Sequence, residues 1–242
     1  MRGKFIVLEG ADGAGTTTQA INLYTLLTTC LGGESVVRTW EPSAGPIGTF
    51  IRGVLKNSDE PWPWREMSYL FMADRLHHVR EEIEPALESG KHVICDRYYA
   101  STLVYQSASA ETREGAEKRF SQLLDEMWRV NVKRGVDHPR VLEPHLWLYL
   151  AVDDVNVLAA RRSGRGEQAE MYESDPFQQR VVEMYEHWHA NASLNTPDRI
   201  DAAPSELSVL EDCWGRVSTL AEVEPSEAST AFSNFCSRRG TV

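Results

Sequence analysis

The sequence has few of the features that mark secreted, membrane-embedded or zinc-binding proteins. It contains only four cysteines among 242 residues, and these form no C-x-x-C pair and have no histidine partners at zinc spacing. We interpret them as buried, reduced thiols, as in a cytoplasmic protein. No apolar run approaches the length of a membrane span, and the N-terminus has no signal-peptide pattern. We therefore expect neither a membrane protein nor a disulfide-stabilised one.

An excess of positive charge is also missing. The chain holds 25 Lys and Arg against 36 Asp and Glu, which gives a formal net charge of −11. Broad electrostatic attraction to nucleic acid is therefore not expected, although a local cluster of arginines can still hold a small phosphorylated ligand. The hydrophobic content of 42% and the charged content of 25% are ordinary for a globular protein. The length suits one large α/β domain better than two small ones.

Apolar periodicity predicts strands that alternate with helices along the chain. This alternation predicts a parallel sheet with helices on both faces. We expect a folded domain over residues 1–221, and a polar, Ser-rich and loosely held tail over residues 222–242. The predicted strands cover residues 5–8, 35–40, 92–95, 146–152 and 199–201, and the main predicted helices cover residues 17–27, 47–55, 67–87, 99–109, 114–134, 155–162, 177–188 and 206–220.

A glycine-rich turn follows the first predicted strand and leads directly into a helix. Strand, turn and helix start in this order are typical of a phosphate-binding P-loop, whose pattern is G-x-x-x-x-G-K-[ST]. Gly10, Gly15 and Thr17 fit this pattern, but Thr16 stands at the lysine position. The lysine normally supplies a point charge to the β- and γ-phosphates, and a threonine cannot. An ordinary strand–turn–helix with convenient glycines is the alternative interpretation.

Two charged residues follow the third predicted strand. Asp96 and Arg97 come at its C-terminal end, where ligands bind in open α/β sheets. An arginine is suited to bridging two phosphate groups, and the carboxylate is suited to holding a magnesium-bound water or fixing that arginine. A purely structural ion pair is the alternative. Phe71 and Arg75 lie four residues apart, so they share one face of a predicted helix.

Several stretches, in the same order along the chain, together resemble the thymidylate kinase family, and the similarity covers roughly residues 3 to 215. The resemblance implies a P-loop nucleoside monophosphate kinase fold with a five-stranded parallel sheet wrapped in helices. It also implies transfer of the γ-phosphoryl group of ATP to dTMP with Mg²⁺, giving dTDP, and a homodimer. The stretches that carry it are residues 5–19, 41–48 (EPSAGPIG), 70–75 (LFMADR), 96–106 (DRYYAS running on to YQ), 144–152 and 161–165.

The resemblance assigns the ATP phosphates to the P-loop and the metal to two oxygen-bearing side chains. The Thr17 hydroxyl and Asp96 would serve Mg²⁺, and a lid over about residues 161–172 would close on ATP and exclude water. We hypothesise that lid arginines replace the charge of the missing lysine; a solvated basic loop is the alternative. The expected ATP-binding residues are Gly10, Ala11, Asp12, Gly13, Ala14, Gly15, Thr16, Thr17 and Thr18, and the expected catalytic residues are Asp12, Arg97, Arg161, Arg162 and Arg165.

The same resemblance assigns a second set of residues to dTMP. Phe71 would stack on thymine and Arg75 would donate to a base carbonyl, while Tyr105 would crowd C2′ and so favour deoxyribose. Asp12 would contact the sugar 3′-hydroxyl. Core packing of Phe71 and a turn-capping Asp12 remain the alternatives. The expected dTMP-binding residues are Asp12, Arg52, Phe71, Arg75, Arg97, Ser101, Tyr105 and Gln106.

The chain departs from the family pattern at three places. Thr16 replaces lysine, Trp40 stands where an R-E-P motif has arginine, and a longer charged stretch through Arg134 replaces the usual glycine-rich run after Gln106. That stretch lies where helices commonly form the family's dimer contact. The leading interpretation is an active dTMP kinase. The alternatives are a kinase for another nucleoside monophosphate and a catalytically weak nucleotide-binding or regulatory protein.

Overall fold

The computed structural model describes residues 2–57, 62–132, 141–164, 172, 174–192 and 196–239. Five strands form one parallel sheet in the order β2-β3-β1-β4-β5. The α/β fold with an all-parallel five-stranded sheet is therefore confirmed. The strands are β1 (Phe5–Glu9), β2 (Val36–Trp40), β3 (His92–Asp96), β4 (Leu146–Ala151) and β5 (Asp198–Asp201).

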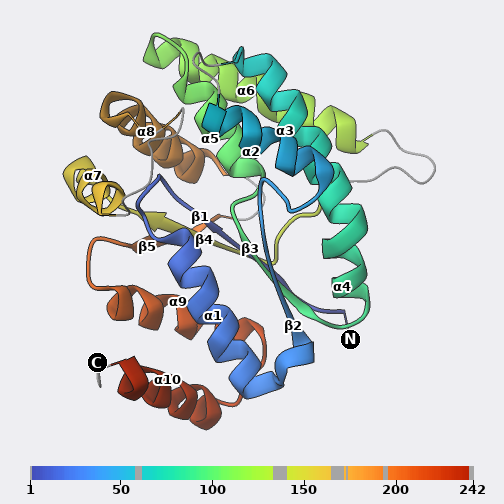
Figure 1. Cartoon of the computed structure of the whole chain (residues 1–242), viewed down its shortest axis with the longest axis vertical. Helices are drawn as coiled ribbons and strands as arrows, with labels where there is room; N and C mark the ends of the chain where they lie inside the picture. Colours follow the sequence, from blue (N-terminus) through green and yellow to red (C-terminus); the bar gives the residue numbers. More distant parts are fainter. Residues whose placement is uncertain are drawn as a thin grey trace.

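Helices cover both faces of this sheet. In Figure 1, α1, α9 and α10 lie on one side, and α2, α3, α5, α6 and α8 lie on the other. A π-helical turn (Val79–Ile83) and a short 3₁₀ turn (Gly33–Ser35) complete the described elements. The helices are α1 (Thr16–Leu31), α2 (Pro46–Asn57), α3 (Trp64–His78), α4 (Glu84–Glu88), α5 (Tyr99–Ala108), α6 (Arg113–Val132), α7 (Val155–Ser163), α8 (Asp175–Asn191), α9 (Glu206–Leu220) and α10 (Pro225–Arg239).

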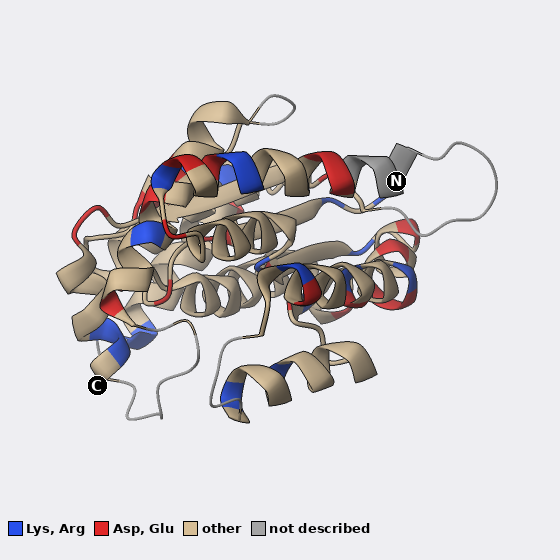
Figure 2. Ribbon diagram, turned by 90° about the horizontal axis from the view of Figure 1, so that it is seen from above, with Lys and Arg blue, Asp and Glu red and all other residues tan. Residues whose placement is uncertain are grey.

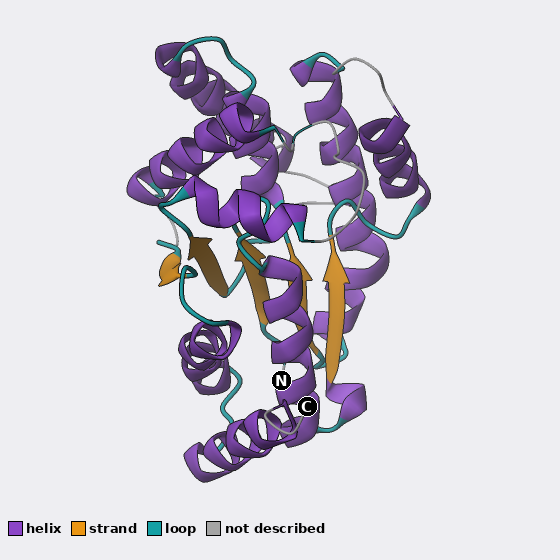
Figure 3. Cartoon of the chain, turned by 60° about the vertical axis from the view of Figure 1, so that its left-hand side comes forward, coloured by secondary structure: helices purple, strands orange, loops and turns teal. Residues whose placement is uncertain are grey.

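The register of the sheet brings chemically important residues to one edge. Leu8 pairs with both Asp96 and Leu148, and Trp40 pairs with Asp96. The strands run in the same direction (Figure 3), so the residues that follow them emerge together at their carboxyl ends. β1 is buried along its whole length, as expected for a central strand covered on both faces. The first turn of α1 and the end of β3 therefore meet at this edge.

Two predicted segments differ from the structure. The single helix expected over residues 67–87 is α3, a π-helical turn and α4 in succession. Pro85 stands near the start of α4, where its missing N–H removes one helical hydrogen bond. The loose tail expected from residue 222 was wrong for α10. This helix buries Ala228 and Ala231, which lie on one face, and the Trp214 indole donates to the Ala228 carbonyl at 3.0 Å.

The chain carries charged residues of both signs, with acidic residues in excess. Figure 2 shows Lys and Arg on several helices, mixed with Asp and Glu. This agrees with the net charge of −11. Within the described part of the chain, no helix has the length and apolarity needed to cross a membrane.

Candidate active site

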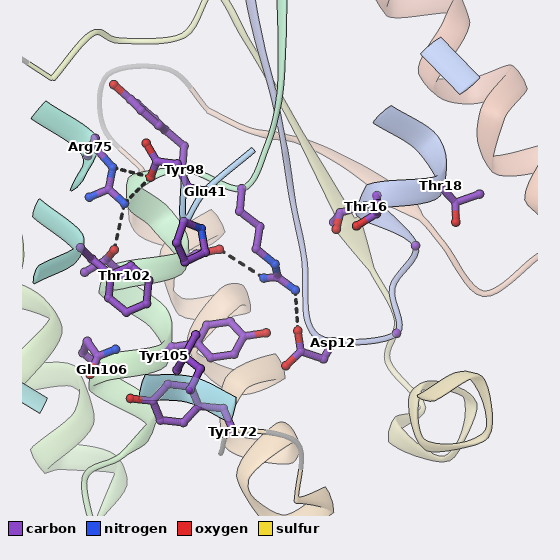
Figure 4. A pocket seen from close by; sticks show the side chains of 18 residues that line it. Asp12, Thr16, Thr18, Glu41, Arg75, Tyr98, Thr102, Tyr105, Gln106 and Tyr172 are labelled. Carbon is purple, nitrogen blue, oxygen red and sulfur yellow. Dashed lines mark hydrogen bonds and ion pairs between the residues drawn. The ribbon is translucent and has the colours of Figure 1, made fainter. Parts of the chain in front are cut away.

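A pocket of about 280 Å³ lies at the carboxyl ends of β1, β2 and β3. One wall is the loop after β1 with the first turn of α1, and the opposite wall comes from α3 and α5 (Figure 4). A crevice at this edge is where open parallel sheets bind ligands. The lining residues are Asp12, Gly13, Gly15, Thr16, Thr17, Thr18, Glu41, Pro42, Leu55, Phe71, Arg75, Arg97, Tyr98, Ser101, Thr102, Tyr105, Gln106 and Tyr172.

The loop after β1 has the backbone geometry of a phosphate cradle, and two of its glycines are required sterically. A Cβ on Gly10 would lie 2.8 Å from the Leu150 carbonyl oxygen. Gly13 has a φ of +97°, and a Cβ there would lie 2.7 Å from the Leu158 carbonyl oxygen. Gly15 also has a φ of +97° and precedes α1 directly. The first N–H groups of that helix therefore face the pocket edge, where an anion is favoured.

The loop ends in three threonines that line the pocket, and one of them contacts Asp96. The Thr17 hydroxyl donates to Asp96 Oδ2 at 2.5 Å, while Asp96 Oδ1 is buried and has no partner in the described part of the chain. Magnesium in nucleotide sites takes one or two protein oxygens and fills its other positions with phosphate and water. No group of three metal-ligating side chains occurs among the described residues. The Thr17–Asp96 pair fits a phosphate-supported Mg²⁺ rather than an all-protein metal site.

Asp12 and Arg97 join the two sides of the sheet edge. Arg97 Nη2 lies 2.6 Å from Asp12 Oδ1, and Arg97 Nη1 donates to the Gly10 carbonyl at 2.8 Å. The Gln178 side chain contacts Asp12 twice, accepting from its N–H and donating to its Oδ2. Arg97 also has a φ of +69°, a backbone conformation that side-chain-bearing residues rarely adopt. The carboxylate and the guanidinium are thus held facing the pocket from fixed backbone positions.

A buried ion pair forms the opposite wall. Arg75 donates to Glu41 through Nε and lies 2.7 Å from the same carboxylate through Nη2, which also donates to Thr102. Both side chains of the pair are almost fully buried. Arg75 Nη1 is buried without a partner. Figure 4 shows the pair across the pocket from Asp12 and Thr16. Arg75 therefore lines the pocket with a guanidinium whose Nη1 group has no hydrogen-bond partner among the described residues.

Behind this pair, a protonated histidine supports Glu41. His78 Nδ1 lies 3.3 Å from Glu41 Oε1, and its Nε2 lies 3.3 Å from Glu82 Oε2. Burial by itself would lower the pKa of His78, but the hydrogen bonds and charges of the two carboxylates raise it to about 9. Glu41 is therefore held between two cationic side chains, Arg75 and His78.

The residues predicted to contact the nucleoside all line the pocket; Asp12 comes from the loop after β1, and the others come from α3 and α5. Phe71 lies one turn before Arg75 on α3 and also packs against the small apolar cluster of Ile51, Val54 and Met67. Ser101, Tyr105 and Gln106 come from α5. The ring of Tyr105 lies 5.3 Å from the Arg97 guanidinium carbon. Phe71 therefore packs against the apolar cluster and lines the pocket at the same time.

Arg52, Arg161 and Arg162 are not among the described residues that line the pocket. Arg52 donates to the Pro42 and Ser43 carbonyls and to the Thr49 hydroxyl. Arg161 donates to backbone carbonyls that follow β5, and its guanidinium lies 3.5 Å from the Gly13 carbonyl. Arg162 donates to the Asp12 carbonyl at 2.8 Å and pairs with Asp175. Arg165 lies outside the described residues.

Sequence reasoning missed several residues of this site. Glu41, Tyr98, Thr102 and Tyr172 line the pocket, yet none was assigned a role. Glu41 carried a usable signal, since a carboxylate directly after an expected strand emerges at the ligand-binding edge. Tyr98 sits next to the predicted Asp96–Arg97 pair, and its ring lies 5.2 Å from the Arg75 guanidinium carbon. Thr102 and Tyr172 are ordinary helix and loop residues that only the folded chain brings to the site.

Comparisons with known proteins agree with this geometry. Residues 8–211 match the family described as Thymidylate kinase. The thymidylate kinase of Synechococcus sp. is 34% identical over 215 residues, which cover 84% of this chain and 95% of that enzyme. That of Limosilactobacillus fermentum is 36% identical over 169 residues, covering 69% and 72%. The match to the Chlamydia felis enzyme is 42% identical but spans only about half of each chain, 48% and 54%.

A solved structure supports the fold independently. The thymidylate kinase of Candida albicans superposes with a TM-score of 0.69 at 24% sequence identity, and the match covers 92% of this chain and 94% of that one. This likeness concerns the fold, which is shared over nearly the whole length of both chains. The family match over residues 8–211, the near-complete alignment with the Synechococcus enzyme and the P-loop at the edge of the parallel sheet lead to one conclusion: the chain belongs to the thymidylate kinase family.

Proposed function

We propose that this protein is a dTMP kinase, which transfers the γ-phosphoryl group of ATP to dTMP and releases dTDP. The observation that carries the proposal is the pairing of two walls across one pocket. A phosphate cradle with the Thr17–Asp96 pair lies on one side, and Phe71 with Arg75 lies on the other. Arg97 stands at the junction of the two. Phosphoryl transfer is mostly positioning and charge neutralisation, so it needs two phosphate sites that face each other.

The acceptor base is recognised at the α3 wall. The Arg75 guanidinium, which lines the pocket, donates to a base carbonyl, and its Nη1 group has no other partner among the described residues. Glu41 and Thr102 fix the other two nitrogens. Phe71 provides the apolar face for the ring, and Tyr105 narrows the space beside the sugar. A site that hydrogen-bonds a specific group discriminates strongly against analogues that lack it.

The phosphates are neutralised at the sheet edge. The N–H groups of the loop from Gly10 to Thr18 hold the ATP phosphates, and Arg97 bridges the donor and acceptor phosphates. Asp12 orients the acceptor sugar and fixes Arg97. Thr17 and Asp96 would hold Mg²⁺, which supplies charge neutralisation on the phosphate oxygens when bound. Arg52 is the second cation proposed for the acceptor phosphate, after release from its present carbonyl partners.

The charge of the absent P-loop lysine comes from the lid. Arg162 already donates to the carbonyl of Asp12, within the loop, and its side chain is only 7% exposed. Arg161 reaches toward the Gly13 carbonyl from the same helix. Together with Arg165, these residues meet the γ-phosphate charge that Thr16 cannot meet. The lid also excludes water from the transfer step.

Steady-state turnover with ATP, Mg²⁺ and a panel of nucleoside monophosphates tests the function. The expected result is formation of dTDP, with dTMP preferred over dUMP, dCMP, dGMP and AMP. Preference for another monophosphate would show that the protein is a kinase for that nucleotide and not for dTMP. Binding of ATP or dTMP without any turnover at ample enzyme would favour a regulatory nucleotide-binding protein instead, an alternative that rests on Thr16. The Arg75→Met variant should lose the preference for dTMP but still bind ATP.

We also propose that the protein acts as a homodimer in the cytoplasm. Phe50 on α2 and Tyr69 on α3 are large aromatic side chains with 51% and 57% of their surface exposed. Exposed aromatic groups on adjacent helices are typical of interaction surfaces. Sedimentation analysis should give twice the chain mass of 27.3 kDa. A Tyr69→Glu variant should shift the protein toward the monomer. A native protein that sediments as a monomer would contradict the proposed homodimer.

A further inference from the structure

Glu9, the last residue of β1, is a fully buried carboxylate that does not line the pocket. Its Oε1 accepts from the backbone N–H groups of Tyr98 and Ser101 at 2.8 and 3.2 Å. Its Oε2 accepts from the Ser101 and Tyr185 hydroxyls at 2.6 and 2.8 Å. Burial raises the pKa of Glu9, while the hydrogen bonds from the Ser101 and Tyr185 hydroxyls and the Tyr98 N–H, and the charge of Arg97, act in the opposite direction. Burying a carboxylate costs free energy unless it is well hydrogen-bonded. The groups that bind Glu9 therefore indicate its role.

Two of these partners hold a strained turn. Arg97 has a φ of +69°, and such conformations persist only where the surrounding structure fixes them. Tyr98 follows Arg97 directly, and Ser101 lies in the first turn of α5. By binding both N–H groups, one oxygen of Glu9 joins the end of β1 to the turn between β3 and α5. The backbone from which Arg97 projects is therefore held by Glu9.

The other two partners touch the guanidinium itself. Arg97 Nη1 lies 3.2 Å from the Ser101 hydroxyl and 3.4 Å from the Tyr185 hydroxyl. A hydroxyl has one hydrogen and two lone pairs. Because each hydroxyl directs its hydrogen at Glu9, each presents a lone pair to Arg97. The Glu9 carboxylate thus fixes the direction in which each hydroxyl donates. The hydroxyl oxygens in turn hold the Arg97 guanidinium in the orientation that faces Asp12.

We propose that Glu9 is the positioning residue for Arg97 and acts through Ser101 and Tyr185. This inference rests on the proposed function, because Arg97 is the phosphate-bridging group of that reaction. Glu9 touches neither substrate. Glu9 instead raises the fraction of time that the Arg97 side chain spends in the orientation required in the transition state. Removing the carboxylate or one of its hydroxyl relays should therefore lower kcat more than it raises the KM for either nucleotide.

A matched pair of tyrosines provides the first test. Tyr149 and Tyr185 stack with ring centroids 5.4 Å apart, but the Tyr149 hydroxyl donates to Glu186, away from Arg97. Both Tyr→Phe changes remove one hydroxyl from the same aromatic stack. Tyr185→Phe should lower kcat by about tenfold, whereas Tyr149→Phe should leave it within about twofold of the native value. Equal effects of the two variants would overturn the proposal.

A double-mutant cycle provides the second test. Glu9→Gln keeps the size of the side chain but not its four acceptor sites. We expect Glu9→Gln to lower kcat by roughly 100-fold in the native background and by less than about threefold when Arg97→Lys is already present. Additive losses would mean that Glu9 merely supports the fold, and would reject the positioning role. A native protein without any kinase turnover would instead reject the proposed function, which separates the two failures.

Discussion

The Arg97 guanidinium lies 2.6 Å from the Asp12 carboxylate, and this contact joins the loop after β1 to the end of β3. Both side chains are about one-fifth exposed, so an incoming phosphate or sugar can reach them. In the function that we propose, the pair has two tasks: Arg97 neutralises phosphate charge, and Asp12 keeps that cation at the boundary between donor and acceptor. The contact would hold Arg97 in place before the substrates arrive.

Loss of this cation should affect the chemical step. Arg97→Ala is expected to lower kcat by about 10²–10³-fold, the range for removing one preorganised donor to developing charge. Asp12→Asn should lower kcat less and raise the KM for dTMP, since the amide retains part of the geometry. Steady-state kinetics with varied ATP and dTMP separates these effects. The exposed Arg113→Ala variant is the control, and unchanged kcat in Arg97→Ala would contradict the assignment.

The Arg75–Glu41 pair should matter for stability as well as for recognition. Both side chains are buried, with exposures of 1% and 4%, so removing one partner leaves the other charge in a dry environment. Glu41→Ala is expected to lower the free energy of unfolding by about 3–5 kcal/mol, as for other broken buried pairs. Urea unfolding measures this loss. For the exposed Arg113–Glu117 pair, Arg113→Ala should cost less than about 1 kcal/mol, and a similar loss in both variants would show that Glu41 is not specially placed.

His78 should give the stability a characteristic pH dependence. Its folded-state pKa is raised to about 9, above the unfolded value of about 6.5. The folded state therefore binds the proton more tightly, and the stabilisation is fully present below pH ~6.5 and is lost as the pH rises toward 9. The size of this effect is of the order of 3 kcal/mol.

Urea unfolding at pH values between 6 and 10 tests the contribution of His78. The native protein should lose stability across this window, and His78→Gln should remove most of that slope. His77→Gln is the matched control, because adjacent side chains on a helix point in different directions. A slope that survives in His78→Gln and disappears in His77→Gln would contradict the assignment.

The part of the fold and the site that could be predicted depends on short-range signals. The P-loop, the sheet and the Asp96–Arg97 pair follow from strand patterns and from residues at strand ends, because parallel strands bring their carboxyl ends together. The site also contains contacts that no local pattern encodes. Glu9 and Tyr185 bond across 176 positions of sequence, and Glu41 meets Arg75 across 34. Such partners are chosen by the packing of helices on the sheet.

The C-terminal helix shows a second limit. Residues 225–239 are polar and Ser-rich, which favoured a loose tail. In the structure, the Arg239 guanidinium lies 3.0 Å from the Asn22 side-chain oxygen, and the helix packs near α1 and α9 (Figure 1). Its packed face combines Ala228 and Ala231 with the partly buried Phe232 and Phe235, which are few among many polar residues and do not stand out in composition. Tertiary packing, rather than local amphipathicity, stabilises most such helices.

Thr16 leads to the remaining prediction, because it removes a charge that phosphoryl transfer requires. We propose that Arg162 replaces this charge, because its guanidinium donates to the Asp12 carbonyl within the loop. Arg162→Ala should lower kcat more than tenfold, which corresponds to about 1.4 kcal/mol of transition-state stabilisation. Thr16→Lys should recover much of this loss in the Arg162→Ala background but change the native enzyme little, because there the charge is already supplied. Kinetics at saturating ATP and dTMP provide the measurement. If Arg161, Arg162 and Arg165 could each become Ala with less than about tenfold loss, the lid would not be the source of that charge.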